Sequence, residues 1–183
     1  FKRTILMKKI LVLSFLILLN NFVFAEENPP KVTTQQFDNW THQCVDNDKQ
    51  KNCEVRQTLR IQNSNLSFSI VYSRFLNDEK NSKGLLTIIA PLGIDVNTQL
   101  ALRFDGKDQT NLFWSTCEPV GCLVFLSDNS KDVKMIETYK KVYDSLIKSS
   151  TLEIAVKGYA NNQPLAIKSE LKGFSAAAKK LNS

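Results

Sequence analysis

The chain has 183 residues, enough for one domain and hardly for two, and its formal net charge is +6. Four of its basic side chains, and none of its acidic ones, fall in residues 1–25. The rest of the chain carries 20 basic and 18 acidic side chains, so it has no strong positive field and we expect no nucleic-acid partner.

The N-terminal segment has the three parts of a secretory signal peptide. Lys8 and Lys9 form a positive n-region, residues 10–19 form an apolar run broken only by a serine, and Ala25 is a small residue at the cut. A transmembrane anchor is the alternative, but a spanning helix needs about 20 apolar residues. We therefore expect residues 1–25 to comprise upstream residues and a cleavable signal peptide, with no membrane span left after cleavage. The expected location is the periplasm or the extracellular side of the outer envelope.

After the cut, residues 26–35 are polar and include Pro29-Pro30, which predicts a flexible leader. Apolar residues then mostly recur at every second position, the period of half-buried strands. The predicted strands cover residues 37 and 40–44, then 53–61, 66–73, 85–90, 100–104, 112–117 and 121–127. Asp105-Gly106 predicts a tight hairpin, because glycine accepts a positive φ. Gln57 is the one polar residue on the apolar side of its strand.

Residues 129–149 change to a spacing of three and four, which predicts an amphipathic helix with Asn129 or Ser130 as its N-cap. Strand spacing returns over residues 152–156 and 165–171, and residues 174–181 predict a short C-terminal helix. Short strands separated by turn residues are typical of a β-sandwich. The sequence thus predicts one mainly β domain over residues 36–183.

All four cysteines, Cys44, Cys53, Cys117 and Cys122, follow the predicted signal peptide. An even number in an exported chain indicates disulfides, and four cysteines permit three pairings. Sequence separation favours Cys44 with Cys53 and Cys117 with Cys122. Zinc is the alternative, but the spacings differ from the paired C-x2-C of zinc ribbons, and a redox C-x-x-C is absent. We therefore expect structural disulfides and no metal site.

His42 is the only histidine, so a Ser-His-Asp or Cys-His catalytic site would have to use it. No G-x-S-x-G elbow supplies a serine, and the neighbouring Cys44 is assigned to a bridge. The candidate carboxylate pairs, Asp46 with Asp48, Asp78 with Glu79 and Asp128 with Asp132, lie in predicted loops or at a helix start, and no glycine-rich phosphate loop is present. We expect no catalytic residue and no cofactor. The alternative is an envelope enzyme or thiol-redox protein that uses His42 or a labile Cys117–Cys122 bridge.

Two features are candidate binding surfaces: the loop closed by Cys117 and Cys122, and the lysine-bearing helix. The helix could lie on a membrane surface, but interspersed acids dilute its charge, so docking against the sheet is the better interpretation. Trp40 and Trp114 are interpreted as packing residues rather than platforms for a sugar or a base. The lysines of the candidate surface are Lys131, Lys134, Lys140, Lys141 and Lys148.

Five short motifs occur in a fixed order: Phe37-Asp38-Asn39-Trp40 followed by Cys44 and Cys53; Pro91-Leu92-Gly93-Ile94; Asp105-Gly106; Cys117-Glu118-Pro119-Val120-Gly121-Cys122; and Leu171-Lys172-Gly173-Phe174-Ser175-Ala176-Ala177. Together they resemble the invasion-associated locus B family of bacterial exported proteins, over residues 36–181. The chain departs from the family pattern at Asp38-Asn39, where the family usually has Gly-Asp, and in a lysine-rich stretch at 131–148 that looks expanded.

The resemblance implies an immunoglobulin-like β-sandwich, a periplasmic or outer-envelope location and no known enzymatic reaction. Some members in host-associated bacteria are linked to host-cell entry. We therefore expect an exported, non-enzymatic protein that acts by protein binding or as an envelope accessory factor. Its partner would be an envelope or host protein, and the sequence names neither that partner nor an oligomeric state.

Overall fold

The structure is a computed structural model, and it describes residues 29–182 except 48–49, 76–82 and 108. The predicted signal peptide lies outside the described residues. The described residues form two antiparallel sheets and two helices, which confirms the prediction of a mainly β sandwich with one amphipathic helix and a short C-terminal helix. Among the described residues, no helix is both long enough and apolar enough to cross a bilayer.

The larger sheet has seven strands in the order β1-β2-β3-β4-β5-β9-β8. Its first five strands follow one another in sequence as an antiparallel meander, and β9 and β8 complete it on the far side of β5. The strands are β1 (Lys31–Phe37), β2 (Trp40–Asp46), β3 (Lys51–Arg60), β4 (Ser67–Phe75), β5 (Lys83–Ala90), β8 (Thr116–Glu118) and β9 (Gly121–Ser127).

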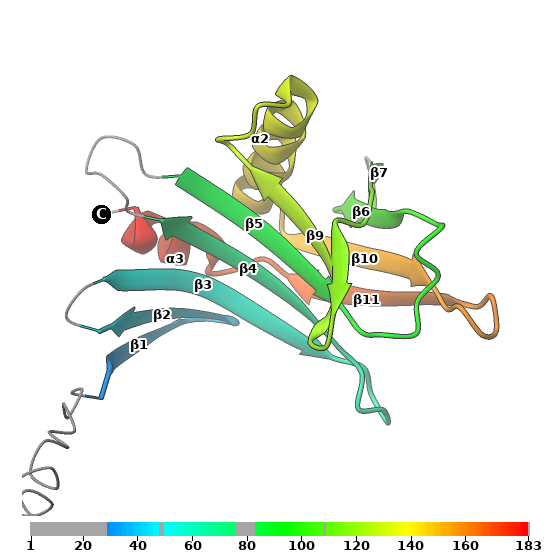
Figure 1. Cartoon of the computed structure of the whole chain (residues 1–183), viewed down its shortest axis with the longest axis horizontal. Helices are drawn as coiled ribbons and strands as arrows, with labels where there is room; N and C mark the ends of the chain where they lie inside the picture. Colours follow the sequence, from blue (N-terminus) through cyan, green and yellow to red (C-terminus); the bar gives the residue numbers. More distant parts are fainter. Residues whose placement is uncertain (1–28, 48–49, 76–82, 108, 183) are drawn as a thin grey trace, which may run out of the picture.

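The smaller sheet has four strands in the order β11-β10-β6-β7. They are β6 (Leu100–Phe104), β7 (Gln109–Leu112), β10 (Thr151–Lys157) and β11 (Pro164–Glu170), and the helices are α2 (Val133–Lys148) and α3 (Phe174–Leu181). In Figure 1 the smaller sheet and α3 lie behind the larger sheet, and α2 stands at the top beside β9. Buried apolar side chains from both sheets and both helices form one continuous core, as expected when one face of each layer is apolar.

Strand β1 includes residues 31–35, which the sequence predicts to be part of a flexible leader. These residues pair in register with β2, from Lys31 opposite Asp46 to Phe37 opposite Trp40. Almost every side chain of β1 is exposed. Because neither face is buried, the strand has no apolar alternation by which the sequence could reveal it.

The predicted strand over residues 112–117 is split between the two sheets. Strand β7 ends at Leu112 in the smaller sheet, and β8 begins at Thr116 in the larger one. The three residues between them, Phe113–Ser115, therefore cross from one layer of the sandwich to the other. The Asp105-Gly106 turn before β7 is as predicted, since both residues have positive φ.

Helix α2 begins later than predicted, and its N-cap is Asp132 instead of Asn129 or Ser130. The Asp132 carboxylate accepts a hydrogen bond from the Lys134 N–H at 2.9 Å. Ser130 instead accepts a hydrogen bond from the Asp132 N–H at 3.0 Å, in the turn that leads into the helix. All three residue types are good caps, so composition alone does not choose among them.

Candidate binding surface

A groove of about 480 Å³ lies between the start of α2 and the segment that crosses between the sheets. Phe113 stands at this groove with 79% of its surface exposed, the highest value among the exposed large hydrophobic residues. Covering this ring together with the adjoining apolar hollow would remove apolar surface from water. The other lining residues are Asn111, Leu112, Trp114, Ser115, Val124, Phe125, Leu126, Asp132, Lys134, Met135 and Thr138.

The wall of the groove is fixed by Trp114, which is half-buried. Its indole Nε1–H donates a hydrogen bond to the backbone oxygen of Thr98 at 2.8 Å. Ser115 adds two further contacts with β9, because its N–H donates to the Leu123 oxygen and its hydroxyl accepts from the Phe125 N–H. The hydrogen bonds of Trp114 and Ser115 thus hold the crossing segment in place, while Phe113 itself is exposed.

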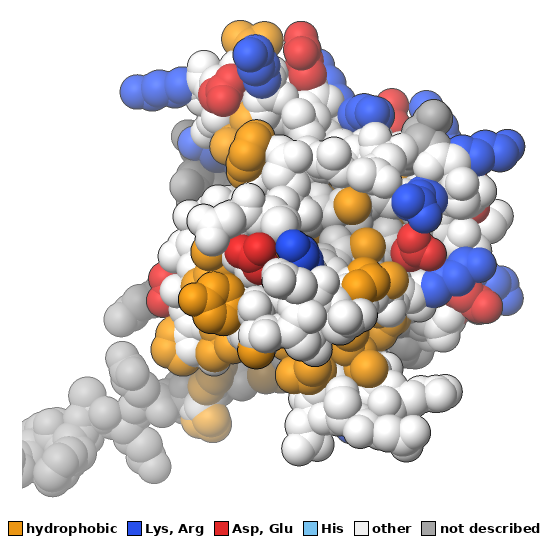
Figure 2. Space-filling view, turned by 90° about the vertical axis from the view of Figure 1, so that its right-hand side faces the viewer, with side chains coloured by type: hydrophobic (Ala, Val, Ile, Leu, Met, Phe, Trp, Pro, Cys, Tyr) orange, Lys and Arg blue, Asp and Glu red, His pale blue; other side chains and the backbone are white. Residues whose placement is uncertain are grey.

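The five predicted surface lysines are all exposed. One of them, Lys134, lines the groove, and Lys148 forms an ion pair with Asp144 at 3.4 Å. Glu137 and Asp144 alternate with lysines at steps of three and four along the outer side of α2. Figure 2 shows the result at the top of the molecule, where blue and red side chains are mixed. Of these five lysines, Lys134 is the one that lines the described groove.

Both predicted disulfides are present. Cys44 lies directly opposite Cys53 in the β2–β3 ladder, and Cys117 lies opposite Cys122 in the β8–β9 ladder. Each bridge therefore joins neighbouring antiparallel strands, and no cysteine is free. In the Cys117–Cys122 loop, which joins β8 to β9, Val120 is exposed.

His42 is buried on β2, and its Nε2 lies 3.8 Å from Cys44 Sγ. Burial lowers the pKa of His42, and the positive charges of Lys180 and Lys51 lower it further. Among the described residues its ring forms no hydrogen bond with a hydroxyl or a carboxylate. The arrangement required for a Ser-His-Asp site is therefore not assembled around His42 in this part of the chain.

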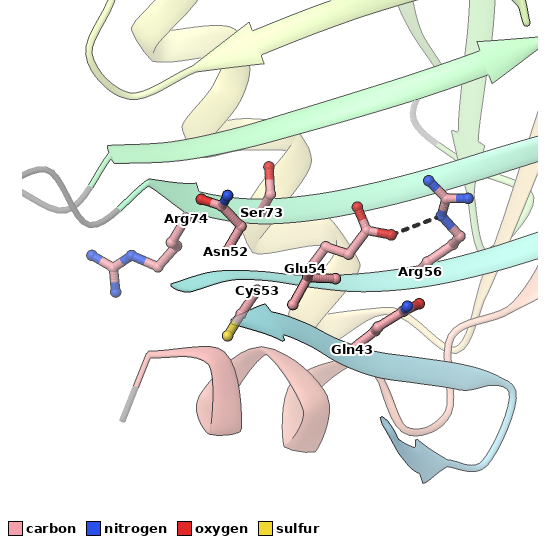
Figure 3. Close-up of a pocket in the computed structure, with 8 residues that line it drawn as sticks. Gln43, Asn52, Cys53, Glu54, Arg56, Ser73 and Arg74 are labelled. Atoms are coloured by element: carbon pink, nitrogen blue, oxygen red, sulfur yellow. Dashed lines mark ion pairs between the residues drawn. The ribbon is translucent and has the colours of Figure 1, made fainter. Parts of the chain in front are cut away.

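A second hollow, of about 400 Å³, lies on the outer face of β2, β3 and β4. Figure 3 shows Glu54 and Arg56 on this face, joined by an ion pair of 3.1 Å, while the Cys53 sulfur points to the other side of the sheet. Both charged side chains are substantially exposed. An exposed ion pair of this kind is common on protein surfaces and is not by itself evidence of a site.

An aromatic cluster joins the two helices to the larger sheet. Tyr72 of β4 packs against Tyr143 of α2 with ring centroids 5.1 Å apart, and Tyr143 stacks on Tyr139 at 5.8 Å. Burial raises the pKa of Tyr72 to about 12 and raises that of Tyr139 as well. Both phenols therefore stay neutral at physiological pH, which is consistent with a packing role.

The groove is a candidate site that the sequence did not reveal. The sequence places Phe113 and Trp114 on opposite faces of one strand, but the chain leaves its sheet after Leu112. The sequence shows two adjacent aromatic residues here, but it does not show which layer of the sandwich each ring joins.

Comparisons of this chain with a family model, with curated proteins and with solved structures all point to one family. A model of the invasion associated locus B (IalB) protein matches residues 40–182. Two curated relatives, each described as an invasion protein B homolog and both from Brucella abortus (strain 2308 and biovar 1 strain 9-941), are 28% identical over 169 residues. The aligned region covers 91% of this chain and 90% of each relative.

The solved structure of invasion associated protein B from Bartonella henselae has the same fold, with a TM-score of 0.59. It is 23% identical to this chain, and the match covers 82% of this chain and 96% of that one. The family match spans the described domain from β2 to the end of α3. The chain therefore belongs to the invasion-associated locus B (IalB) family.

Proposed function

We propose that this chain is an exported, non-enzymatic protein of the bacterial envelope that acts by binding another protein. The contact surface is the groove between α2 and the crossing segment, with Phe113 and Lys134 at its rim. The partner is a protein segment that places an apolar side chain in the groove and an acidic side chain against Lys134. This partner belongs to the envelope or, as the names of the relatives suggest for those proteins, to a host cell.

The exposed Phe113 is the observation that carries this proposal. Aromatic rings in apolar hollows are typical centres of protein interfaces, because covering them removes much apolar surface from water. Lys134 supports an acidic partner, since it forms no ion pair within the described residues, whereas Lys148 is already paired with Asp144. The neighbouring Asp132 is engaged by the helix N-terminus.

Export is supported by the disulfides and by the predicted signal peptide. Two bridges between neighbouring strands suit an oxidising compartment such as the periplasm or the outside of the cell. Intact-mass analysis of the exported protein is expected to give a chain that starts at Glu26. A mature chain that retains the apolar run of residues 10–19 would contradict cleavage.

A photo-crosslinking amino acid placed at Met135 tests the groove directly. We expect it to form a discrete crosslinked product in intact cells, and mass spectrometry then identifies the partner. The product should be lost when Phe113→Ser or Lys134→Glu is added. Tyr159→Ser is the matched control, because Tyr159 is similarly exposed but does not line the groove.

A second control separates this proposal from the enzyme alternative. His42→Ala should leave the crosslink and the envelope phenotype of the strain unchanged. If His42→Ala alone abolishes the phenotype while the protein stays folded, the binding function is wrong and the enzyme or thiol-redox alternative replaces it. If Phe113→Ser leaves the crosslink intact, the groove is not the contact surface.

A further inference from the structure

Three potential metal ligands gather on the inner side of the larger sheet, away from the proposed groove. His42 and Cys44 are two residues apart on β2, so their side chains point to the same face. Cys53 lies directly opposite Cys44 on β3. The ring nitrogen and the two sulfur atoms all lie within 4.8 Å of one another.

In the structure the two sulfur atoms are joined as a disulfide, and a disulfide offers no thiolate to a metal. Reduction by a dithiol reductant adds two electrons and two protons, breaks the sulfur–sulfur bond and leaves two thiols, while the reductant becomes a disulfide. The reduced chain then presents two cysteines and one histidine. This donor set holds Zn²⁺ in known catalytic sites, with a fourth position left for water.

We propose that the reduced form of this protein binds one Zn²⁺ ion through His42, Cys44 and Cys53. Binding releases the two thiol protons, so that two thiolates and one neutral imidazole coordinate the ion. The charge of two thiolates balances that of the metal. Disulfide formation and zinc binding are therefore mutually exclusive states of the same pair of strands.

The surroundings suit a site that is ordered yet reachable. His42 and Cys44 are buried, and α3 packs against β2 and β3 on this side of the sheet. Cys53 is only half-buried, and its sulfur points away from the outer hollow of Figure 3, toward the side of the sheet that α3 covers. A reductant and a metal ion thus have a route to the pair past Cys53, while the other two ligands are held by the core.

The second disulfide provides an internal comparison. Cys117 and Cys122 are also opposite one another on neighbouring strands. Within the described residues, however, no third ligand gathers with them, and the chain's only histidine is on β2. A dithiol without a third ligand should bind zinc much more weakly. Comparing the two reduced cysteine pairs therefore distinguishes a three-ligand zinc site from the general affinity of thiols for zinc.

The test uses the exported chain carrying Cys117→Ser and Cys122→Ser, reduced with a phosphine under anaerobic conditions. Co²⁺ is the probe, because thiolate-to-cobalt absorption reports sulfur ligation and the visible bands report tetrahedral geometry. We expect one Co²⁺ per chain, displaced by one Zn²⁺, and no binding to the oxidised protein. A chain with Cys44→Ser and Cys53→Ser but an intact Cys117–Cys122 pair, treated in the same way, should give no such spectrum.

His42→Ala is the decisive variant. Loss of a group that merely supports a ligand costs about 10- to 100-fold in metal affinity, so loss of a ligand should cost at least as much. Equal affinity in His42→Ala would overturn the proposal, and so would equal binding by the Cys117–Cys122 pair. Circular dichroism checks that the reduced, metal-free protein is folded, because the two thiols of an unfolded chain would bind cobalt without dependence on His42.

Discussion

Trp40 and Phe174 are in contact in the core, with ring centroids 4.7 Å apart and ring planes tilted by 58°. Trp40 starts β2 and Phe174 starts α3, so the contact joins the two ends of the domain. Both side chains are fully buried. The motif that ends at Trp40 and the motif around Phe174, which are far apart in sequence, are thus in contact in the folded domain.

Phe174→Ala is expected to lower the free energy of unfolding by about 3–5 kcal/mol, because it leaves a cavity beside Trp40. Lys172→Ala is the control at the same junction. Lys172 pairs with Asp38 at 2.9 Å, but both side chains are exposed and the pair is screened by solvent, so its loss should lower stability far less than Phe174→Ala does. Urea unfolding followed by circular dichroism measures both, and equal losses would contradict the dominance of the apolar contact.

Gly173→Ala should be more harmful than Gly93→Ala. The two glycines have nearly equal φ angles, +93° and +89°, so each substitution carries a backbone cost of roughly 1–2 kcal/mol. A methyl group at Gly173 would also collide with the backbone oxygen of Phe37, whereas one at Gly93 would meet nothing within 4 Å. Overpacking should add about 1–3 kcal/mol at Gly173 alone. Equal urea unfolding midpoints for the two variants would show that the backbone at Phe37 moves away from the added methyl group at little cost.

Much of this fold could be predicted because an element with one buried face has apolar residues at a regular spacing in the sequence. Strand β3 alternates between a more buried and an exposed face from Val55 to Arg60, and α2 shows the spacing of a helix with one buried side. Strand β1 could not be predicted in this way, since both of its faces are exposed. The cap of α2 was missed because three good capping residues stand within four positions.

The candidate site was less predictable than the fold. Alternation says which residues share a face, but it does not say which sheet a strand joins. The crossing at Phe113–Ser115 depends on β7 pairing with β6 and β8 pairing with β9, which are long-range choices. The lysines of α2 were visible in the sequence, but only the structure places Lys134 beside an apolar groove.

Asp105 is expected to contribute stability that depends on pH. Its carboxylate accepts hydrogen bonds from the Thr151 N–H at 2.8 Å and from the Ser150 N–H at 3.0 Å. The Thr151 bond is the largest cause that holds the pKa of Asp105 below its ordinary value. As pH falls below about 4, the unfolded chain takes up this proton before the folded one does, so folding is progressively weakened.

Asp105→Asn should therefore show a smaller loss of stability than the parent chain between neutral pH and pH 3, although it is less stable at pH 7. Urea midpoints measured across this range check the difference. Asparagine keeps one side-chain oxygen as an acceptor, so the variant should still fold. Parallel curves for the two proteins would mean that Asp105 titrates alike in the folded and unfolded states.

The last prediction concerns Gln57, the polar residue on the apolar side of β3. It is only 6% exposed, and its Oε1 accepts a hydrogen bond from the hydroxyl of Ser169 on β11. Because β3 and β11 belong to different sheets, this bond joins the two layers of the sandwich. Gln57 Nε2 donates more weakly, at 3.4 Å, to the backbone oxygen of Glu170.

Ser169→Ala should lower the free energy of unfolding by about 1–3 kcal/mol, because it leaves the Gln57 oxygen buried without its donor. Gln57→Leu combined with Ser169→Ala removes both polar partners, and it should recover most of that loss. Thr58→Ala is the matched control, since Thr58 also bonds a serine hydroxyl, that of Ser69, but on the exposed face. Chemical unfolding of the single and double variants gives the coupling free energy between the two residues. A double variant less stable than Ser169→Ala would show that the polar bridge stabilises the sandwich beyond satisfying its own buried atoms.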